Sequence, residues 1–299
     1  MISYHSWIIY NGNLPQEKFI ELASWMEKVA HQHQVTTQLM KNNSLLPTVV
    51  NGRLALEGQD MLPDFVIFLD KDILLAKHLE MMGIPVYNSA SAIEICDNKS
   101  LTFQRLAAHG IPMPKTILAP FVFFEHQDMT PFERAADSLG FPLVVKEAYG
   151  SFGMQVYLVH TTEELFALVR EIGNRPFLLQ EFIASSKGRD VRLNVVGDKV
   201  VASMLRVSDT DFRANVSNGG KMMTYEPTQA EMNLAVRCSQ LVGADFSGVD
   251  ILFASDGSPL VCEINSNAHI KNIFDCTGIN VAEYIVPHIL EKFKGQIAP

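Results

Sequence analysis

The sequence lacks the features of membrane-bound, secreted and zinc-binding proteins. No apolar run approaches the ~20 residues that a membrane-spanning helix needs. The first residues show neither the basic segment nor the apolar segment of a signal peptide. The four cysteines are scattered, without a C-x-x-C pair, so that neither a disulfide framework nor a zinc site is indicated. We therefore expect a cytoplasmic protein with reduced thiols and no membrane association.

Positive charge is also scarce in this chain of 299 residues. Lys and Arg number 24 against 33 Asp and Glu, which gives a formal net charge of −9 and disfavours binding to nucleic acid or to anionic membranes. Hydrophobic residues make up 47% and charged residues 19%, a balance that excludes a disordered chain and supplies a sizeable core. At about 100–200 residues per domain, two or three domains fit the length.

Strands and helices alternate along the chain, which predicts an α/β or α+β fold. Residues 1–97 read as a small parallel α/β domain, because residues 65–69 form a continuous apolar run that is typical of a buried parallel strand. This domain is expected to hold strands at 2–10, 65–69 and 84–87, and helices at 19–30 and 73–82.

The rest of the chain is divided at residue 184. Residues 98–184 predict a helix at 101–109, strands at 143–146, 154–159 and 177–182, and two helices that begin with capping boxes at Thr130 and Thr161. Residues 185–299 predict hairpins with two-residue turns at Gly197-Asp198 and Asp256-Gly257, and a helix at 228–241.

The last hairpin carries the strongest chemical signal. A two-residue turn at Asp256-Gly257 places Asp250 directly opposite Glu263, and Asn265 projects from the same face. Two opposed carboxylates repel unless a cation lies between them, and oxygen ligands of this kind suit Mg²⁺ or Mn²⁺. The alternative is a solvated polar face, but the apolar run 251–253 disfavours an exposed hairpin.

A glycine loop after Lys146 is the second signal. The segment Gly150-Ser151-Phe152-Gly153 lies between two predicted strands, where backbone N–H groups can surround an anion and a lysine can add charge. No helix follows the glycines, so the loop is not a Walker A or Rossmann motif and is closer to the loop that covers phosphates in kinases. A plain hairpin turn is the alternative, and Lys99 could by itself be an ordinary surface lysine.

Downstream, a strand end and a group of arginines add to the pattern. The strand that ends at Gln180-Glu181-Phe182-Ile183 can offer free backbone groups to the edge of an adenine, although a plain strand end is the alternative.

Asp190 and Arg192 share one strand face, and Arg206, Arg213 and Asn215 follow. Guanidinium groups clamp phosphate and carboxylate, although a surface ion pair would explain Asp190 and Arg192 as well. With a two-residue turn at Gly197-Asp198, Arg206 falls on the opposite face from Arg192, and a bulge or a strand end is needed to bring both arginines to one site.

The order of these elements resembles the ATP-grasp superfamily, and within it the RimK-like branch of α-L-glutamate ligases. The resemblance covers roughly residues 84–286. The stretches that carry it are Asn98-Lys99 with Gly110-Ile111-Pro112-Met113-Pro114, Val144-Val145-Lys146 through Gly153, Gln180-Glu181-Phe182-Ile183, Gly188-Arg189-Asp190-Val191-Arg192, Phe212-Arg213-Ala214-Asn215 with Gly219-Gly220, Gly248-Val249-Asp250 and Glu263-Ile264-Asn265.

The resemblance implies an ATP-grasp fold in which two α+β lobes clasp ATP behind a small N-terminal domain. It implies an ATP-dependent carboxylate–amine ligase that works through an acyl phosphate, with an amino acid such as glutamate as amine and a small molecule or a peptide or protein terminus as partner substrate. Homodimers or homotetramers are expected. The alternatives are a phosphotransferase on the same fold and a non-catalytic nucleotide-binding module.

The resemblance also implies roles for individual residues. For the nucleotide, it assigns the ATP phosphates to Lys99, Lys146 and the loop of Gly150, Ser151 and Gly153, the adenine to Glu181, Phe182 and Ile183, and the ribose to Asp190. Arg213 and Asn215 are assigned to the triphosphate side, and two Mg²⁺ ions to Asp250, Glu263 and Asn265. The substrate carboxylate and the acyl phosphate are assigned to Arg192 and Arg206. Residues 151–156 are expected to move as a lid.

One segment departs from the branch. Where the RimK-like pattern resembles Asn-Ser-Ser-Pro-Gly, residues 265–271 read Asn-Ser-Asn-Ala-His-Ile-Lys. We hypothesise that Lys271 contributes to an anionic acceptor site, with an ordinary surface lysine as the alternative.

Overall fold

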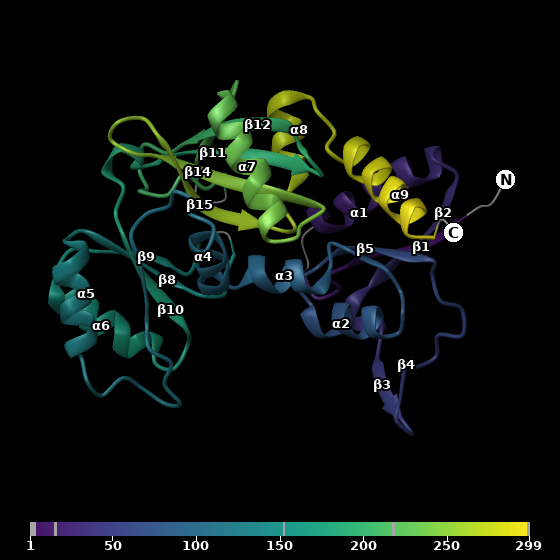
Figure 1. Cartoon of the computed structure of the whole chain (residues 1–299), viewed down its shortest axis with the longest axis horizontal. Helices are drawn as coiled ribbons and strands as arrows, with labels where there is room; N and C mark the ends of the chain where they lie inside the picture. Colours follow the sequence, from purple (N-terminus) through teal and green to yellow (C-terminus); the bar gives the residue numbers. More distant parts are fainter. Residues whose placement is uncertain (1–3, 15–16, 152, 217–218, 298–299) are drawn as a thin grey trace.

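The first part of the chain forms a parallel four-stranded sheet. The computed structural model describes residues 4–14, 17–151, 153–216 and 219–297 (Figure 1). The sheet has the order β2-β1-β5-β6, with β1 at Tyr4–Tyr10, β2 at Val35–Lys41, β5 at Phe65–Leu69 and β6 at Val86–Tyr87. All five residues of β5 are buried, as the apolar run predicts.

Helices cover both faces of this sheet. Successive side chains of β1 alternate between the two faces, so that Ile8 packs towards α1 (Glu17–Gln32) and Trp7 towards α2 (Ile73–Met81) and α3 (Ala90–Asp97). The C-terminal helix α9 (Ala282–Ile297) completes the α1 side, and the ring of its Phe293 packs against Phe65 at 4.9 Å between centroids, tilted by 41°. Among the described helices, none combines the length and apolarity that spanning a bilayer requires.

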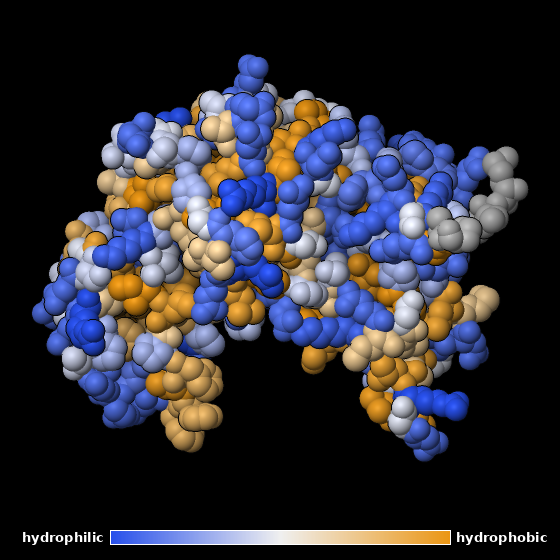
Figure 2. Space-filling view, in the orientation of Figure 1, coloured by the Kyte–Doolittle hydropathy of each residue, from blue (hydrophilic) through white to orange (hydrophobic). Residues whose placement is uncertain are grey.

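The N-terminal part contains elements that the sequence analysis did not identify. They are β2, α3 and the hairpin of β3 (Pro47–Val50) and β4 (Arg53–Leu56). The hairpin projects from the body of the protein, and its exposed Val49 and Val50 contribute to the apolar surface there (Figures 1 and 2). Asn51 and Gly52 both have positive φ, which is the conformation that an Asn-Gly hairpin turn requires.

The second sheet is antiparallel. Its order is β7-β10-β8-β9, with β7 at Thr116–Leu118, β8 at Leu143–Glu147, β9 at Val156–Val159 and β10 at Phe177–Glu181. The helices α5 (Thr130–Leu139) and α6 (Thr162–Ile172) cover one face, and their core centres on Phe132 stacked against Phe177.

The two capping boxes expected in this part have different outcomes. The Thr161 hydroxyl caps α6 by accepting the Glu164 N–H, while the Glu164 carboxylate accepts the N–H of His160. Thr130 does not cap α5; its N–H instead donates to Asp128, because the helix starts one residue earlier than a Thr130 cap requires. The prediction was therefore wrong at Thr130.

The third sheet separates an apolar face from a charged one. It is antiparallel in the order β13-β12-β11-β14-β15, with β11 at Arg189–Val196, β12 at Lys199–Val207, β13 at Lys221–Thr224, β14 at Phe246–Phe253 and β15 at Pro259–Asn265. Val191, Leu193 and Val195 pack towards α7 (Gln229–Leu241), so the intervening Asp190 and Arg192 project from the opposite face. Helix α4 (Lys99–Ala107) adds Leu106 to the apolar side.

The β14–β15 hairpin pairs as expected at its chemically important end. Asp250 lies opposite Glu263, and Gly248 lies opposite Asn265. The two-residue turn at Asp256-Gly257 was wrong, because Ala254 and Ser258 close a longer turn in which the Ala254 N–H donates to the Ser258 carbonyl at 2.8 Å. The longer turn shifts the pairing by one residue, and a register shift next to Asp250 restores it.

The β11–β12 hairpin contains the bulge that Arg206 requires. Val196 pairs with Lys199 around a two-residue turn, and the register shifts between Asn194 and Val195. Arg206 thereby lies opposite Asp190 and on the same face as Arg192.

A buried asparagine joins the N-terminal sheet to the third sheet. The Asn88 amide nitrogen donates to the carbonyls of Phe246 and Ser266, both at 2.8 Å, and its oxygen accepts the N–H groups of Asp245 and Phe246. We expect Asn88→Ala to lower the free energy of unfolding by about 3 kcal/mol, because buried backbone groups lose their partners. Urea denaturation measures this.

The surface variant Asn233→Ala serves as the control for Asn88→Ala. Asn233 is an exposed helical residue, so its replacement should change stability by less than about 0.5 kcal/mol. Equal stabilities of the two variants would contradict the structural role of Asn88.

Candidate functional site

Two adjoining cavities lie between the sheets. The first holds about 850 Å³ of empty space, including solvent at its mouth. Fourteen of the sixteen residues named from the sequence line it: Lys99, Lys146, Gly150, Ser151, Gly153, Glu181, Phe182, Ile183, Asp190, Arg206, Arg213, Asn215, Asp250 and Glu263. Arg192 and Asn265 line the second cavity instead. The structure therefore brings all sixteen to one connected region.

The two lysines are buried without a counter-ion. Lys99 begins α4 and Lys146 lies on β8, and each is only 6% exposed. Within the described residues, neither ammonium group forms an ion pair. Burial lowers the pKa of Lys99, although Glu263 opposes this. Two buried cations without a carboxylate partner are suited to an anionic ligand such as a triphosphate.

The glycine loop is tied to the segment around Arg213. The Arg213 guanidinium donates to the carbonyls of Gly153 and Val156, and it is paired with Asp211 at 2.7 Å. Gly153 has a φ of +72°, and a Cβ there would lie 3.0 Å from the Asn215 side chain, so glycine suits this close approach. Phe152, at the centre of the loop, lies outside the described residues.

The strand end at Glu181 borders an apolar part of the first cavity. The Glu181 carboxylate accepts the Lys115 N–H at 2.6 Å, and Phe182 contacts Phe212 edge-to-face. Val144 and Leu252 also line the cavity, and the sequence analysis missed both. Strand parity could have identified them, because Val144 is two residues from Lys146 and Leu252 is two residues from Asp250.

Two aspartates and two arginines form a buried ionic cluster. Asp250 accepts Nε and Nη2 of Arg192 and also Nη2 of Arg206 at 3.0 Å. Asp190 accepts Nε and Nη2 of Arg206 at 2.6 and 2.7 Å. Burial alone would raise the pKa of Asp250, but the two guanidinium groups outweigh burial and hold it below its usual range. The two arginines therefore neutralise the negative charge of Asp250, which the sequence analysis expected a metal ion to neutralise.

The remaining oxygen donors fit a divalent cation. Among the described residues, no hydrogen bond or ion pair engages the Glu263 carboxylate, and Asn265 projects from the same face of β15. The arginine N–H groups take three of the roughly four acceptor sites of the Asp250 carboxylate. Glu263 and Asn265 thus suit Mg²⁺, and Asp250 can add about one further oxygen contact.

The second cavity extends from Arg192 to the N-terminal sheet. It encloses about 1440 Å³, including open solvent. Its N-terminal lining includes Asn11, Asp70 and Lys71, which the sequence analysis missed. They directly follow β1 and β5, and ligands of parallel sheets bind at the carboxyl ends of strands, a rule that could have found them.

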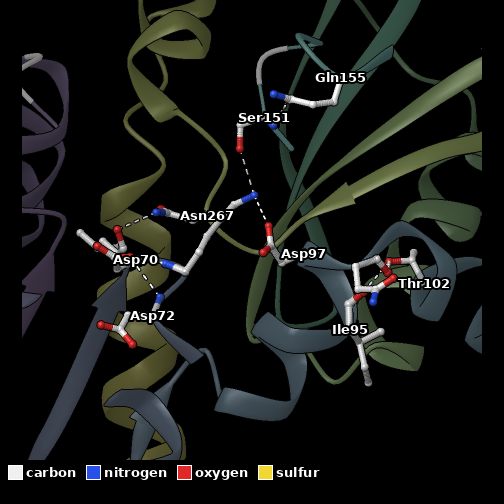
Figure 3. A network of polar contacts seen from close by, with 11 residues as sticks. Asp70, Asp72, Ile95, Asp97, Thr102, Ser151, Gln155 and Asn267 are labelled. Atoms are coloured by element: carbon white, nitrogen blue, oxygen red, sulfur yellow. Dashed lines mark hydrogen bonds and ion pairs between the residues drawn. The ribbon is translucent and has the colours of Figure 1, made fainter. Parts of the chain in front are cut away.

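Lysines at the second cavity are paired with aspartates. Lys271 lines the cavity, but its ammonium group donates to Asp275 at 2.6 Å on the surface of α8 (Ile270–Thr277). The Lys71 ammonium group donates hydrogen bonds to Asp97 and to the Ser151 hydroxyl of the glycine loop. In Figure 3 the side chains of Asp97 and Ser151 point towards the same position. Lys71 thus connects the N-terminal domain with the expected lid.

Gly248 allows the close packing beside Arg192. A Cβ at this position would lie 2.5 Å from the Cβ of Ala268 and 3.0 Å from Cδ of Arg192. We expect Gly248→Ala to displace the Arg192 side chain and to lower turnover at least about tenfold, since small displacements of groups that line a site are costly.

Steady-state kinetics of Gly248→Ala measures this loss. The control is Gly295→Ala, because Gly295 lies in α9 and a Cβ there would have no close neighbours. Gly243→Ala is unsuitable as a control, because Gly243 has a positive φ. Unchanged kinetics for Gly248→Ala would show that the placement of Arg192 does not depend on a glycine at position 248.

The chain is similar to known proteins in both sequence and fold. The model of the RimK-like ATP-grasp domain matches residues 96–289. The chain is 31% identical to beta-citrylglutamate synthase B of Danio rerio, over 98% of this chain and 75% of that protein. It is 34% identical to human N-acetylaspartylglutamate synthase A, over 91% of this chain and 72% of that protein.

A solved structure supports the fold. The D-alanine–D-alanine ligase of Bacillus anthracis in complex with ATP superposes with a TM-score of 0.74 at 19% identity, covering 98% of this chain and all of that one. The fold is therefore an ATP-grasp fold, and this chain belongs to the RimK-like ATP-grasp family as an ATP-dependent ligase that forms carbon–nitrogen bonds.

Proposed function

We propose that the protein uses ATP to activate one carboxylate of a small polycarboxylic acid and joins it to the amino group of L-glutamate. The relatives named above make glutamate conjugates of citrate and of N-acetylaspartate. The observation that carries the proposal is the continuity of the two cavities, which share Ser151, Gly153, Arg206, Asn215 and Glu263. A phosphoryl group held in the first cavity can thereby reach an acid held in the second.

The residues of the first cavity suit the nucleotide. Lys99, Lys146 and the glycine loop would hold the phosphates, while Val144, Leu252 and Phe182 would enclose the base. Glu263 and Asn265, with Asp250, would hold two Mg²⁺ ions, which neutralise phosphate charge when bound. No protein nucleophile is needed, because the acid itself attacks the γ-phosphorus and the protein contributes alignment and charge.

The arginines suit the acid. Arg192 lines only the second cavity and Arg206 lines both, so their guanidinium groups lie at the junction. A carboxylate bound there would compete with Asp250 for the same N–H groups. Planar guanidinium groups that already hold a carboxylate are suited to hold the acid and its acyl phosphate.

The test is ADP release over a matrix of acids and amines. Citrate, N-acetylaspartate and short peptides serve as acids, amino acids including L-glutamate serve as amines, and mass spectrometry identifies the product. We expect ADP release that requires both substrates, together with an amide product. ADP release without an amine, with a stable phosphorylated acid, would show a phosphotransferase instead.

We also propose that the chain forms a homodimer or homotetramer, as the family resemblance implies. The exposed apolar β3–β4 hairpin is consistent with this proposal. Sedimentation velocity at micromolar concentration tests it, and a monomer would contradict it.

A further inference from the structure

Asp70 is a buried carboxylate at the edge of the second cavity. It directly follows β5, lines the cavity and is 5% exposed. Its Oδ1 accepts the N–H groups of Lys71 at 2.5 Å and Asp72 at 3.1 Å. Its Oδ2 has no hydrogen-bond partner among the described residues. Figure 3 shows Asp70 beside Asn267, another residue that lines the cavity.

The lysines and arginines of this cavity differ from Asp70 in having ionic partners. Arg192 is paired with Asp250, Lys71 with Asp97, and Lys271 with Asp275. In the described part of the chain, Asp70 forms no ion pair. Burial raises its pKa, and the backbone N–H groups of Lys71 and Asp72 and the side chain of Asn11 oppose this.

An unpaired buried carboxylate is costly unless a cation meets it. Asp70 is the more deeply buried of the two carboxylates in this cavity that lack an ionic partner among the described residues, and the neutral amides of Asn11 and Asn267 line the cavity with it. An ammonium group fits this environment, because it has three N–H donors and a single charge.

We propose that Asp70 binds the ammonium group of the amine substrate and accepts its proton. This inference rests on the proposed function, which requires an amine in the second cavity. An amino acid enters with its amino group protonated, and a protonated nitrogen has no lone pair for attack.

The proton balance of the step is complete. The Asp70 carboxylate takes one proton from the ammonium group, and the nitrogen lone pair attacks the acyl carbon. The C–N bond forms, the bond from carbon to the phosphate oxygen breaks, and inorganic phosphate leaves with that electron pair and the second nitrogen proton. Asp70 returns its proton to solvent when the product leaves.

Asp70→Asn tests the proposal because it keeps the shape and the Oδ1 acceptor while removing the charge. We expect KM for L-glutamate to rise and glutamate-dependent turnover to fall about a hundredfold, the usual contribution of a general base. KM for ATP and KM for the acid should stay unchanged. Hydroxylamine is mostly unprotonated at neutral pH, so hydroxamate formation should stay within about twofold of the wild type.

Asp72→Asn is the matched control. Asp72 neighbours Asp70 in the sequence, but its carboxylate caps α2 at the Leu75 N–H and does not line the cavity. This variant should retain glutamate-dependent turnover. Thermal unfolding should show Asp70→Asn to be at least as stable as the wild type, since it removes an unpaired buried charge.

The outcomes separate this inference from the proposed function. Equal loss of hydroxamate and of glutamate product in Asp70→Asn, or no loss of either, would overturn the role of Asp70 and leave the ligase reaction intact. A wild-type protein that forms hydroxamate but accepts no amino acid would also overturn the role of Asp70. A wild-type protein that forms neither product would contradict the proposed function, and the amine site with it.

Discussion

Glu263→Gln is expected to reduce ATP-dependent turnover roughly a thousandfold while leaving stability unchanged. The Glu263 carboxylate has no partner among the described residues, so the substitution breaks no ion pair and should change the free energy of unfolding by less than about 0.5 kcal/mol. It removes a negative charge from the junction of the two cavities, where the proposed Mg²⁺ ions bind.

The Mg²⁺ dependence of the rate shows whether the metal is involved. The concentration of Mg²⁺ that gives half-maximal activity should rise in Glu263→Gln, and Mn²⁺ should restore more activity than Mg²⁺. Glu291→Gln, at an exposed position of α9, is the control that should match the wild type. Substantial turnover in Glu263→Gln with an unchanged Mg²⁺ dependence would refute the metal assignment.

Asp250→Asn is expected to abolish turnover and also to destabilise the fold. Asp250 accepts hydrogen bonds from two buried arginines, and removing one member of such a cluster leaves excess positive charge inside the protein. Loss of one partner in a buried ion pair costs about 3–5 kcal/mol. Chemical denaturation should therefore separate this variant from Glu263→Gln, although both lie on paired positions of one hairpin.

The difference in the free energy of unfolding between Asp250→Asn and the wild type should become smaller at acidic pH. Because the arginines hold the pKa of Asp250 below its unfolded value, this carboxylate stabilises the fold above about pH 4 and loses that contribution as the pH falls through the lower folded value. Denaturation curves at neutral pH and near pH 3 measure the change. An equal difference at both pH values would show that charge does not explain the loss of stability.

Local sequence patterns predicted much of the fold. The apolar run of β5, the Thr161 cap of α6 and the turn at Gly197 follow from side-chain chemistry that acts within a few residues. The edge strand β2 alternates without a strong apolar pattern, and the β3–β4 hairpin is largely exposed. Val35 and Met40 of β2 and Leu56 of β4 are their buried core residues, too few to give a continuous or alternating hydrophobic signal.

Register shows where local reasoning stops. Asp250 faces Glu263 although the turn differs from the expected one, because a longer turn and a bulge offset each other. Bulges are set by packing across a whole sheet, so neither the longer turn nor the bulge could be predicted from the hairpin sequence alone. The same holds for Arg206, which shares a face with Arg192 only because of the bulge beside Asn194.

The sequence by itself determined the chemical inventory of the site and its order along the chain: the lysines, the glycine loop, the arginines and the oxygen donors of the last hairpin. The tertiary structure alone decided how they are partnered. Asp250 is held by arginines from two other strands, and Asp70 reaches the second cavity from a different sheet. The reason is physical, because side-chain chemistry is a local property, whereas burial and charge pairing depend on segments that meet only in the folded chain.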